Sequence, residues 1–217
     1  MNIRIVQTHP EYFECARRAS QRVVFADIPG EEAFTVDMFL QHIARFPDGQ
    51  FTALAETDAG EVVVGSTTTM RTNETFEGDH HPYYFDFIGR GTISTHVPDG
   101  EWLYGIDVGV HPGFRRLGIG GRLYAARADL VRRLNLRGEI VVGLLPGYPR
   151  YRDAMTVEAY AREVAAGRLS DPTLSMQISV GFRLRGLMYD YVTDPRSDNA
   201  VSLIVRENPA YRPDDAP

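Results

Sequence analysis

Hydrophobic and polar positions alternate with a period close to two in several stretches of the chain, and this period is typical of β-strands. The Asp58-Ala59-Gly60 turn between two of these stretches predicts an antiparallel hairpin. The β-branched stretch that ends at Pro146-Gly147 predicts a strand parallel to the strand of 102–110. The predicted strands cover residues 2–6, 51–56, 61–70, 102–110, 139–145, 182–191 and 200–206.

In other stretches the hydrophobic positions repeat with a period near 3.6, and helix caps bound these stretches. Thr35 and Thr156 are in N-cap positions, and Gly167 follows the second of these helices. Residues 72–100 show no clear period and predict an inserted loop or short hairpin, and 208–217 predict a frayed tail. The predicted helices cover 11–23, 36–45, a core helix after residue 118, 157–166 and a short segment between 171 and 181.

The core helix follows a glycine-rich turn, and the period changes there from two to about 3.6. Gly118, Gly120 and Gly121 have no Cβ, so the backbone can turn tightly and approach a ligand closely. The first N–H groups of a helix lack partners within the helix. This turn therefore predicts an anion site.

Two common phosphate-binding motifs do not fit these residues. A P-loop needs lysine after its second glycine, but the chain contains no lysine. The dinucleotide fingerprint G-x-G-x-x-G would need glycine where Leu123 stands. The motif that remains is R-x-x-G-x-G, from Arg115 to Gly120.

This motif resembles the pyrophosphate-binding motif of the GNAT superfamily of N-acetyltransferases, and the order of predicted elements is similar to the GNAT fold along nearly the whole chain. The resemblance implies an α/β (α+β) fold with a mixed central sheet of about six to seven strands and helices on both faces. It also implies two strands that splay at the acetyl-CoA site. We expect one domain over residues 1–207.

A narrower resemblance rests on four short motifs outside the glycine turn. They look like the GNAT module that is found fused to nitrilase-type carbon–nitrogen hydrolases. The chain stops soon after Pro209, so we expect a standalone module. The motifs are Leu136-Arg137-Gly138, Pro146-Gly147-Tyr148, Asp171-Pro172-Thr173-Leu174-Ser175 and Asn208-Pro209.

The resemblance also implies where acetyl-CoA binds. The phosphates would lie on the glycine turn, and the pantetheine arm would pair with the backbone of the preceding strand. Seven arginines and one acid between positions 115 and 137 suit the phosphates, although Arg127, Arg132 and Arg133 could instead solvate the outer face of the helix. The expected binding residues are Val108, Gly109, Val110, Arg115, Arg116, Leu117, Gly118, Ile119, Gly120, Gly121 and Arg122.

The sequence says least about the acid and the base. Many family members place a tyrosine acid four residues before the Gly-Phe pair, where this chain has Gln177. Tyr148 is the best substitute for the acid, and Tyr104 stands where some members carry a glutamate base. The other candidates, each of which could be a rim or hydrogen-bonding residue, are Tyr151, Glu101, Asp107, Asp86 and His96.

Composition limits the kinds of ligand and partner that we expect. The 217 residues carry a net charge of −6, which argues against nucleic acid as a partner. Cys15 is the only cysteine, and His80-His81 beside Asp79 lacks a third ligand, so we expect no disulfide and no metal. No stretch resembles a signal peptide or a membrane span, so we expect a cytoplasmic protein that binds no membrane. A homodimer remains possible.

Together these features predict an acyltransferase that moves an acetyl group from acetyl-CoA to a primary amine of a small molecule or peptide, by direct attack in a ternary complex. Seven carboxylates against one arginine between positions 74 and 107 would attract a cationic amine. The alternative is a non-catalytic acetyl-CoA-binding sensor or partner module, because Gln177 cannot supply a proton as tyrosine does.

Overall fold

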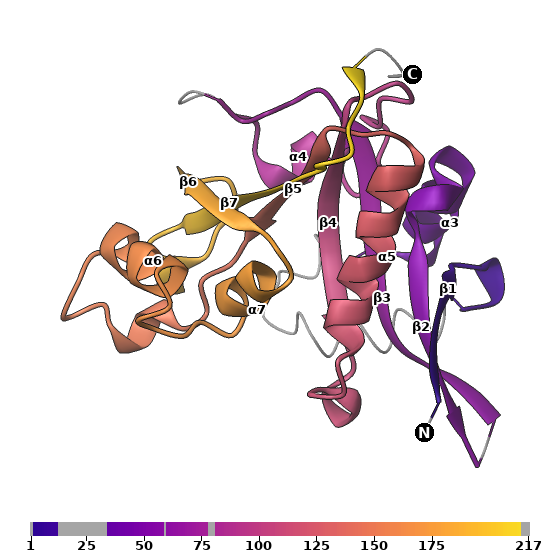
Figure 1. Ribbon diagram of the computed structural model, residues 1–217, viewed down its shortest axis with the longest axis horizontal. Coiled ribbons are helices and arrows are strands. Elements are labelled where there is room, and N and C mark those ends of the chain that lie inside the picture. The colour runs from indigo at the N-terminus through magenta and orange to yellow at the C-terminus, as the bar shows by residue number, and fades with distance from the viewer. Residues whose placement is uncertain (1, 13–33, 59, 78–80, 214–217) are drawn as a thin grey trace.

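The computed structural model describes residues 2–12, 34–58, 60–77 and 81–213. A sheet of seven strands runs through this part of the chain in the order β1-β2-β3-β4-β5-β7-β6 (Figure 1). The prediction of a mixed sheet with six to seven strands is confirmed. Most of the predicted helix at 11–23, and Cys15 with it, lies outside the described residues.

The strands keep close to their predicted bounds. Within the described residues, β4 and β5 form the parallel pair, and every other neighbouring pair is antiparallel. The strands are β1 Ile3–Gln7, β2 Phe51–Thr57, β3 Gly60–Thr72, β4 Trp102–Val110, β5 Gly138–Gly143, β6 Arg183–Tyr189 and β7 Ala200–Glu207.

The helices cover both faces of the sheet. Side chains alternate along a strand, and on β3 the Thr67 hydroxyl contacts Arg127 of α5, whereas Ser66 lines a small cavity together with His42 of α3. The two helices therefore lie on opposite faces. The helices are α3 Val36–Arg45, α4 Tyr84–Phe87, α5 Ile119–Arg133, α6 Val157–Ala165 and α7 Leu174–Ser179, with 3₁₀ turns at η1 Pro10–Tyr12, η4 Pro47–Gly49, η5 Pro112–Phe114, η6 Tyr148–Arg150 and η7 Pro195–Ser197.

Two segments differ from their sequence-based description. The described part of the connection between β3 and β4 holds the single helical turn α4 and a series of tight turns rather than a hairpin. The beginning of the expected frayed tail is docked on the domain. Asn208 Nδ2 donates to the Leu136 carbonyl at 2.8 Å, and the Arg212 N–H donates to the Asn135 side chain at 3.0 Å.

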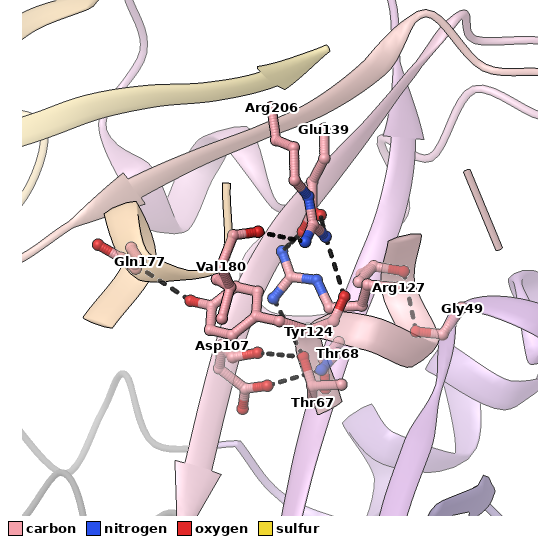
Figure 2. A network of polar contacts seen from close by, with 11 residues as sticks. Gly49, Thr67, Thr68, Asp107, Tyr124, Arg127, Glu139, Gln177, Val180 and Arg206 are labelled. Atoms are coloured by element: carbon pink, nitrogen blue, oxygen red, sulfur yellow. Dashed lines mark hydrogen bonds and ion pairs between the residues drawn. The ribbon is translucent and has the colours of Figure 1, made fainter. Parts of the chain in front are cut away.

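A buried ion-pair network joins α5 to the sheet (Figure 2). Glu139 of β5 is fully buried and contacts two guanidinium groups, one from Arg127 of α5 and one from Arg206 of β7. Arg127 is 1% exposed, and its Nη1 also donates to the Thr67 hydroxyl at 3.2 Å. Arg127 therefore neither solvates the outer face of the helix nor reaches a phosphate at the glycine turn.

Gly105 of β4 makes room for this network. A Cβ at position 105 would stand 1.5 Å from Arg127 Nη2 and 2.8 Å from a methyl group of Val141. Both neighbours are part of the buried structure, so neither can move away freely. The guanidinium of Arg127 occupies the space that any other residue at 105 would need.

On the opposite face, His42 is a buried histidine of α3. Its Nε2 is 2.7 Å from the carbonyl oxygen of Gly91, and its ring packs edge-on against Phe34 and Phe39. Burial lowers the pKa of His42 to about 4. The imidazole is therefore neutral in the folded protein at neutral pH.

Replacing Gly105 with alanine should destabilise the fold strongly. The new Cβ would displace Arg127 and leave the Glu139 carboxylate short of a buried partner, so we expect the free energy of unfolding to fall by about 3 kcal/mol or more. Urea denaturation measures this change. The matched control is Gly186→Ala in β6, where a Cβ would meet no atom within 4 Å. A Gly105→Ala protein as stable as the control would contradict the packing role of Gly105.

The stability of the protein should fall in acid partly through His42. The pKa of His42 is about 4 in the folded state and about 6.5 in the unfolded chain, so between these values only the unfolded chain binds the proton. The contribution of His42 to the free energy of unfolding is complete above about pH 6.5 and is lost as the pH falls towards 4. About 2 kcal/mol of it is lost at pH 5.

Urea denaturation at pH 7 and pH 5 tests this assignment. The difference in unfolding free energy between the two pH values should shrink by about 2 kcal/mol in His42→Gln. The matched control is His9→Gln, because the His9 side chain is 64% exposed. An unchanged difference in His42→Gln would show that other groups cause the acid sensitivity.

Candidate functional site

The start of α5 has the form of an anion site. Gly118 is its N-cap, with a φ of 75° in the left-handed region, and Arg116 two residues earlier has a φ of 62°. The first turn of α5 holds no acidic residue, and no side chain caps it. The first N–H groups of the helix therefore point to the turn at the lower end of α5 in Figure 1 without an intrahelical acceptor.

The glycines of this turn border open space. A Cβ at Gly118 or Gly121 would meet no atom within 4 Å, and one at Gly120 would meet Met176 Cε at 3.8 Å. No intramolecular packing in the described residues explains the absence of side chains at these positions. The open backbone allows a phosphate to approach the N–H groups closely.

The arginines at the turn are exposed and face solvent. Arg115 folds back towards β4, where its Nε lies 3.4 Å from the Val110 carbonyl. Within residues 2–12, 34–58, 60–77 and 81–213, no ion pair involves Arg115, Arg116 or Arg122. Leu117 is 48% exposed between them. These exposed guanidinium groups flank the start of α5.

A split opens in the sheet beside this turn. The parallel pairing of β4 with β5 runs only from Trp102↔Gly138 to Gly105↔Val141. Beyond it, β4 continues along β3 to Val110, whereas β5 continues along β7 to Gly143. In Figure 1, β5 and β7 lean to the left, away from β4. The predicted splaying of two strands is therefore observed.

An irregularity in β4 marks the start of the split. The register between β3 and β4 shifts after Gly105, and Ile106 has no partner residue on β3. After this bulge, Val108 and Gly109 pair with β3 on one side only, because β5 has left the other side. No strand of the described residues pairs with Val108 or Gly109 on that side, which leaves backbone polar groups available to a ligand.

The hydroxyl of Tyr104 is not exposed at this split. Tyr104 is fully buried, and its hydroxyl lies 2.7 Å from the hydroxyl of Tyr191. Burial raises the pKa of Tyr104 far above its ordinary value, so the phenol stays protonated at neutral pH. This environment opposes the role of base that the sequence position suggests.

Tyr148 lies on the 3₁₀ turn after β5 and contacts the α6 region. Its hydroxyl donates to the Met155 carbonyl at 3.3 Å, and its ring packs 5.6 Å from that of Tyr160. Burial and the nearby Asp198 raise the pKa of Tyr148. Its proton is already used in a hydrogen bond within this segment.

Of the remaining candidates, Asp107 is the carboxylate at the split. Its Oδ1 accepts from the Thr68 N–H at 2.7 Å, directly after the bulge. Glu101 and Asp86 form ion pairs with exposed arginines at 3.0 and 2.7 Å. His96 Nδ1 accepts from a backbone N–H of β3.

Two tyrosines near the split are absent from the sequence-based candidates. The Tyr84 hydroxyl of α4 donates to the carbonyl of Ile106, the bulge residue, at 3.2 Å. The Tyr124 hydroxyl of α5 accepts from Gln177 Nε2 at 3.2 Å. Tyr84 lies in the stretch without a period, where the sequence offers no signal. Tyr124 directly follows the buried Leu123 in the core helix, but its hydrogen-bond partner Gln177 is more than fifty positions away in the sequence.

Gln177 and Gly143 pack against each other at the end of β5. A Cβ at Gly143 would stand 2.8 Å from Gln177 Oε1, so the glycine accommodates the amide. Gln177 is 3% exposed. Asp171 holds the helix that carries it, because its carboxylate accepts from the N–H groups of Leu174 and Gly147, both at 2.9 Å.

In the described residues, no group of three or more His, Cys, Asp or Glu side chains is arranged to hold a metal ion. His80 and Asp79 lie outside that part of the chain. None of the described helices has both the length and the apolar character that crossing a membrane requires.

A model of the acetyltransferase (GNAT) family matches residues 13–146. The chain is 40% identical over 180 residues to a protein of Bacillus subtilis (strain 168) described as "Probable hydrolase YhcX"; the match covers 83% of this chain and only 34% of that relative. The "Uncharacterized N-acetyltransferase YkwB" of the same organism is 29% identical, with 85% and 79% of the two chains covered. Among solved structures, the loading GNATL domain of CurA from Lyngbya majuscula has the same fold, with a TM-score of 0.78, 17% identity and coverage of 95% and 98%.

Proposed function

Because the chain belongs to the GNAT family of acetyltransferases, we propose that it binds acetyl-CoA in the split between β4 and β5 and transfers the acetyl group to a primary amine. The acceptor is an amine of a small molecule or a peptide. The observation that carries the proposal is the split itself, which opens beside the uncapped, glycine-rich start of α5.

The glycine turn would hold the phosphates of acetyl-CoA. The N–H groups of residues 116–121 and the positive end of the α5 dipole attract a pyrophosphate. Arg115, Arg116 and Arg122 are exposed around the same turn. One guanidinium group can bind two phosphate oxygens at once, which suits a ligand with a pyrophosphate and a further phosphate.

The open edge of β4 would bind the pantetheine arm. Val108, Gly109 and Val110 present backbone groups there, because β5 no longer pairs with them. An N–H group of this edge would also stabilise the oxyanion that forms on the thioester carbonyl. The irregular backbone at Ile106 changes the direction of the groups that follow it.

Direct attack by the amine is the proposed route. The amine nitrogen forms a bond to the thioester carbon, and the carbon–sulfur bond breaks as the tetrahedral intermediate collapses. The nitrogen must lose a proton and the thiolate must gain one. Asp107 is the carboxylate nearest in the chain to the open edge of β4, but its Oδ1 already accepts a backbone hydrogen bond.

The second candidate function is acetyl-CoA binding without turnover, as a sensor or as the partner of a hydrolase. Two observations favour it: Gln177 cannot act as an acid, and a relative described as a probable hydrolase matches this chain over a third of its own length. In this case the split would bind acetyl-CoA and release no thiol.

Thiol release separates the two functions. The protein is incubated with acetyl-CoA and, in turn, tyramine, spermidine and a short peptide with a free α-amine, and free thiol is followed with time. We expect release above the hydrolytic background with at least one amine. Acetyl-CoA binding by calorimetry without thiol release from any of the three classes would support the sensor instead.

Gly120→Glu should weaken CoA binding strongly without harming the fold. The carboxylate would occupy the phosphate position, so we expect at least about a 100-fold weaker Kd, or roughly 2.7 kcal/mol. The same charge is favourable at a helix N-terminus, so Tm should not fall. The matched control is Gly120→Ala, because a Cβ there has open space. Equal CoA affinity of the two variants in calorimetry would refute the phosphate assignment.

A further inference from the structure

Tyr124 occupies the point where the two strands of the split separate. Its ring is 2% exposed and packs in one cluster with Val141, the last residue of β5 that pairs with β4. Val108, on the open edge of β4, packs against the same cluster. The ring therefore belongs to the cluster against which residues from both arms of the split pack.

The hydroxyl of Tyr124 has a proton that its observed hydrogen bond does not use. The phenol oxygen accepts from Gln177 Nε2, so the O–H remains able to donate (Figure 2). Gln177 in turn lies against Gly143, the last residue of β5. The amide thus holds the hydroxyl near the end of β5.

A second observation at this place points to a ligand. Gln177 Oε1 is a buried acceptor that has no hydrogen-bond partner among the described residues. Leaving such an atom unsatisfied costs about 1–3 kcal/mol. The amide N–H groups of a pantetheine arm are donors of the kind that this oxygen lacks.

The surroundings of Tyr124 can stabilise negative charge on its oxygen. The Arg127 guanidinium lies over the ring at 4.9 Å from its centre, and Arg206 Nη2 donates to the Tyr124 carbonyl at 2.9 Å. Glu139 between the two arginines has the opposite effect. Burial raises the pKa of Tyr124 and outweighs the lowering by Arg127 and Gln177, so the hydroxyl is protonated at neutral pH.

We propose that Tyr124 is the proton donor to the thiolate of CoA, with Gln177 holding its hydroxyl in place. The proposal rests on the proposed function. When the carbon–sulfur bond breaks, the electron pair on sulfur takes the proton of Tyr124 Oη, which gives the CoA thiol and a tyrosinate. The amine nitrogen loses one proton to solvent, and the tyrosinate regains one from solvent, so the transfer is balanced.

The test is the rate of thiol release by the full chain with acetyl-CoA and the amine that wild type acetylates fastest among tyramine, spermidine and a free α-amine peptide. We expect Tyr124→Phe to lower kcat by about 100-fold or more, while the Kd for CoA changes by less than about threefold. Tyr189→Phe is the control, because Tyr189 is 42% exposed on β6 and its hydroxyl bonds to Glu158 of α6. Tyr148→Phe tests the competing assignment.

Three outcomes would overturn the proposal. Full kcat in Tyr124→Phe would exclude the proton transfer, and so would a loss of kcat in Tyr148→Phe alone. A loss of both CoA affinity and Tm in Tyr124→Phe would show that the residue has a structural role instead. Absence of thiol release by wild type is distinct from these, because it removes the proposed function first.

A second variant keeps the hydroxyl in case phenylalanine disturbs the cluster. Replacement of Tyr124 by 3,5-difluorotyrosine lowers the phenol pKa with little change in shape. If Tyr124 donates the proton, the alkaline limb of the kcat–pH profile must move to lower pH, because the donor ionises earlier. A profile that coincides with wild type would overturn the assignment.

Discussion

The ion pair between Arg127 and Glu139 is the interaction on which the central part of this structure depends. A buried carboxylate is costly unless it is paired and hydrogen-bonded, and Glu139 meets guanidinium groups from α5 and β7. Arg127 also binds Thr67, whose hydroxyl donates to the carbonyl of Asp107 after the β4 bulge. One charged cluster thus fixes the positions of α5, β3, β4, β5 and β7 relative to each other.

The same cluster explains where the sheet divides. Gly105 is the last β4 residue that pairs with β5, and it is also the residue against which Arg127 lies. Below this point β4 stays with β3, while β5 stays with β7. The guanidinium therefore marks the closed end of the split, and the glycine turn of α5 lies at its open side. A ligand in the split would lie between the Arg127–Glu139 ion pair and the uncapped start of α5.

Local features of the chain were predictable, and long-range ones were not. Thr35 caps the helix Val36–Arg45 through a bond to Met38, three positions away, so the sequence contains the whole motif. Strand periods and the glycine turn are equally local. In the sequence, Arg127 looks like one of seven surface arginines. Its burial depends on Glu139, Arg206 and Gly105, and no local pattern in the sequence links these residues to it. Among the buried tyrosines the sequence favours Tyr104 and Tyr148, since it cannot show which hydroxyl has a proton to give.

Successive side chains of β4 point to opposite faces of the sheet, and the two faces have different surroundings beside the split. Gly105 faces Arg127 on the α5 side, whereas the preceding Tyr104 packs among aromatic rings that include Phe76 and Tyr191. Charged and hydrogen-bonding groups therefore gather on the α5 side. The opposite side holds a buried aromatic cluster. The two faces of β4 beside the split therefore differ in chemistry, and the bulge at Ile106 follows directly after Gly105.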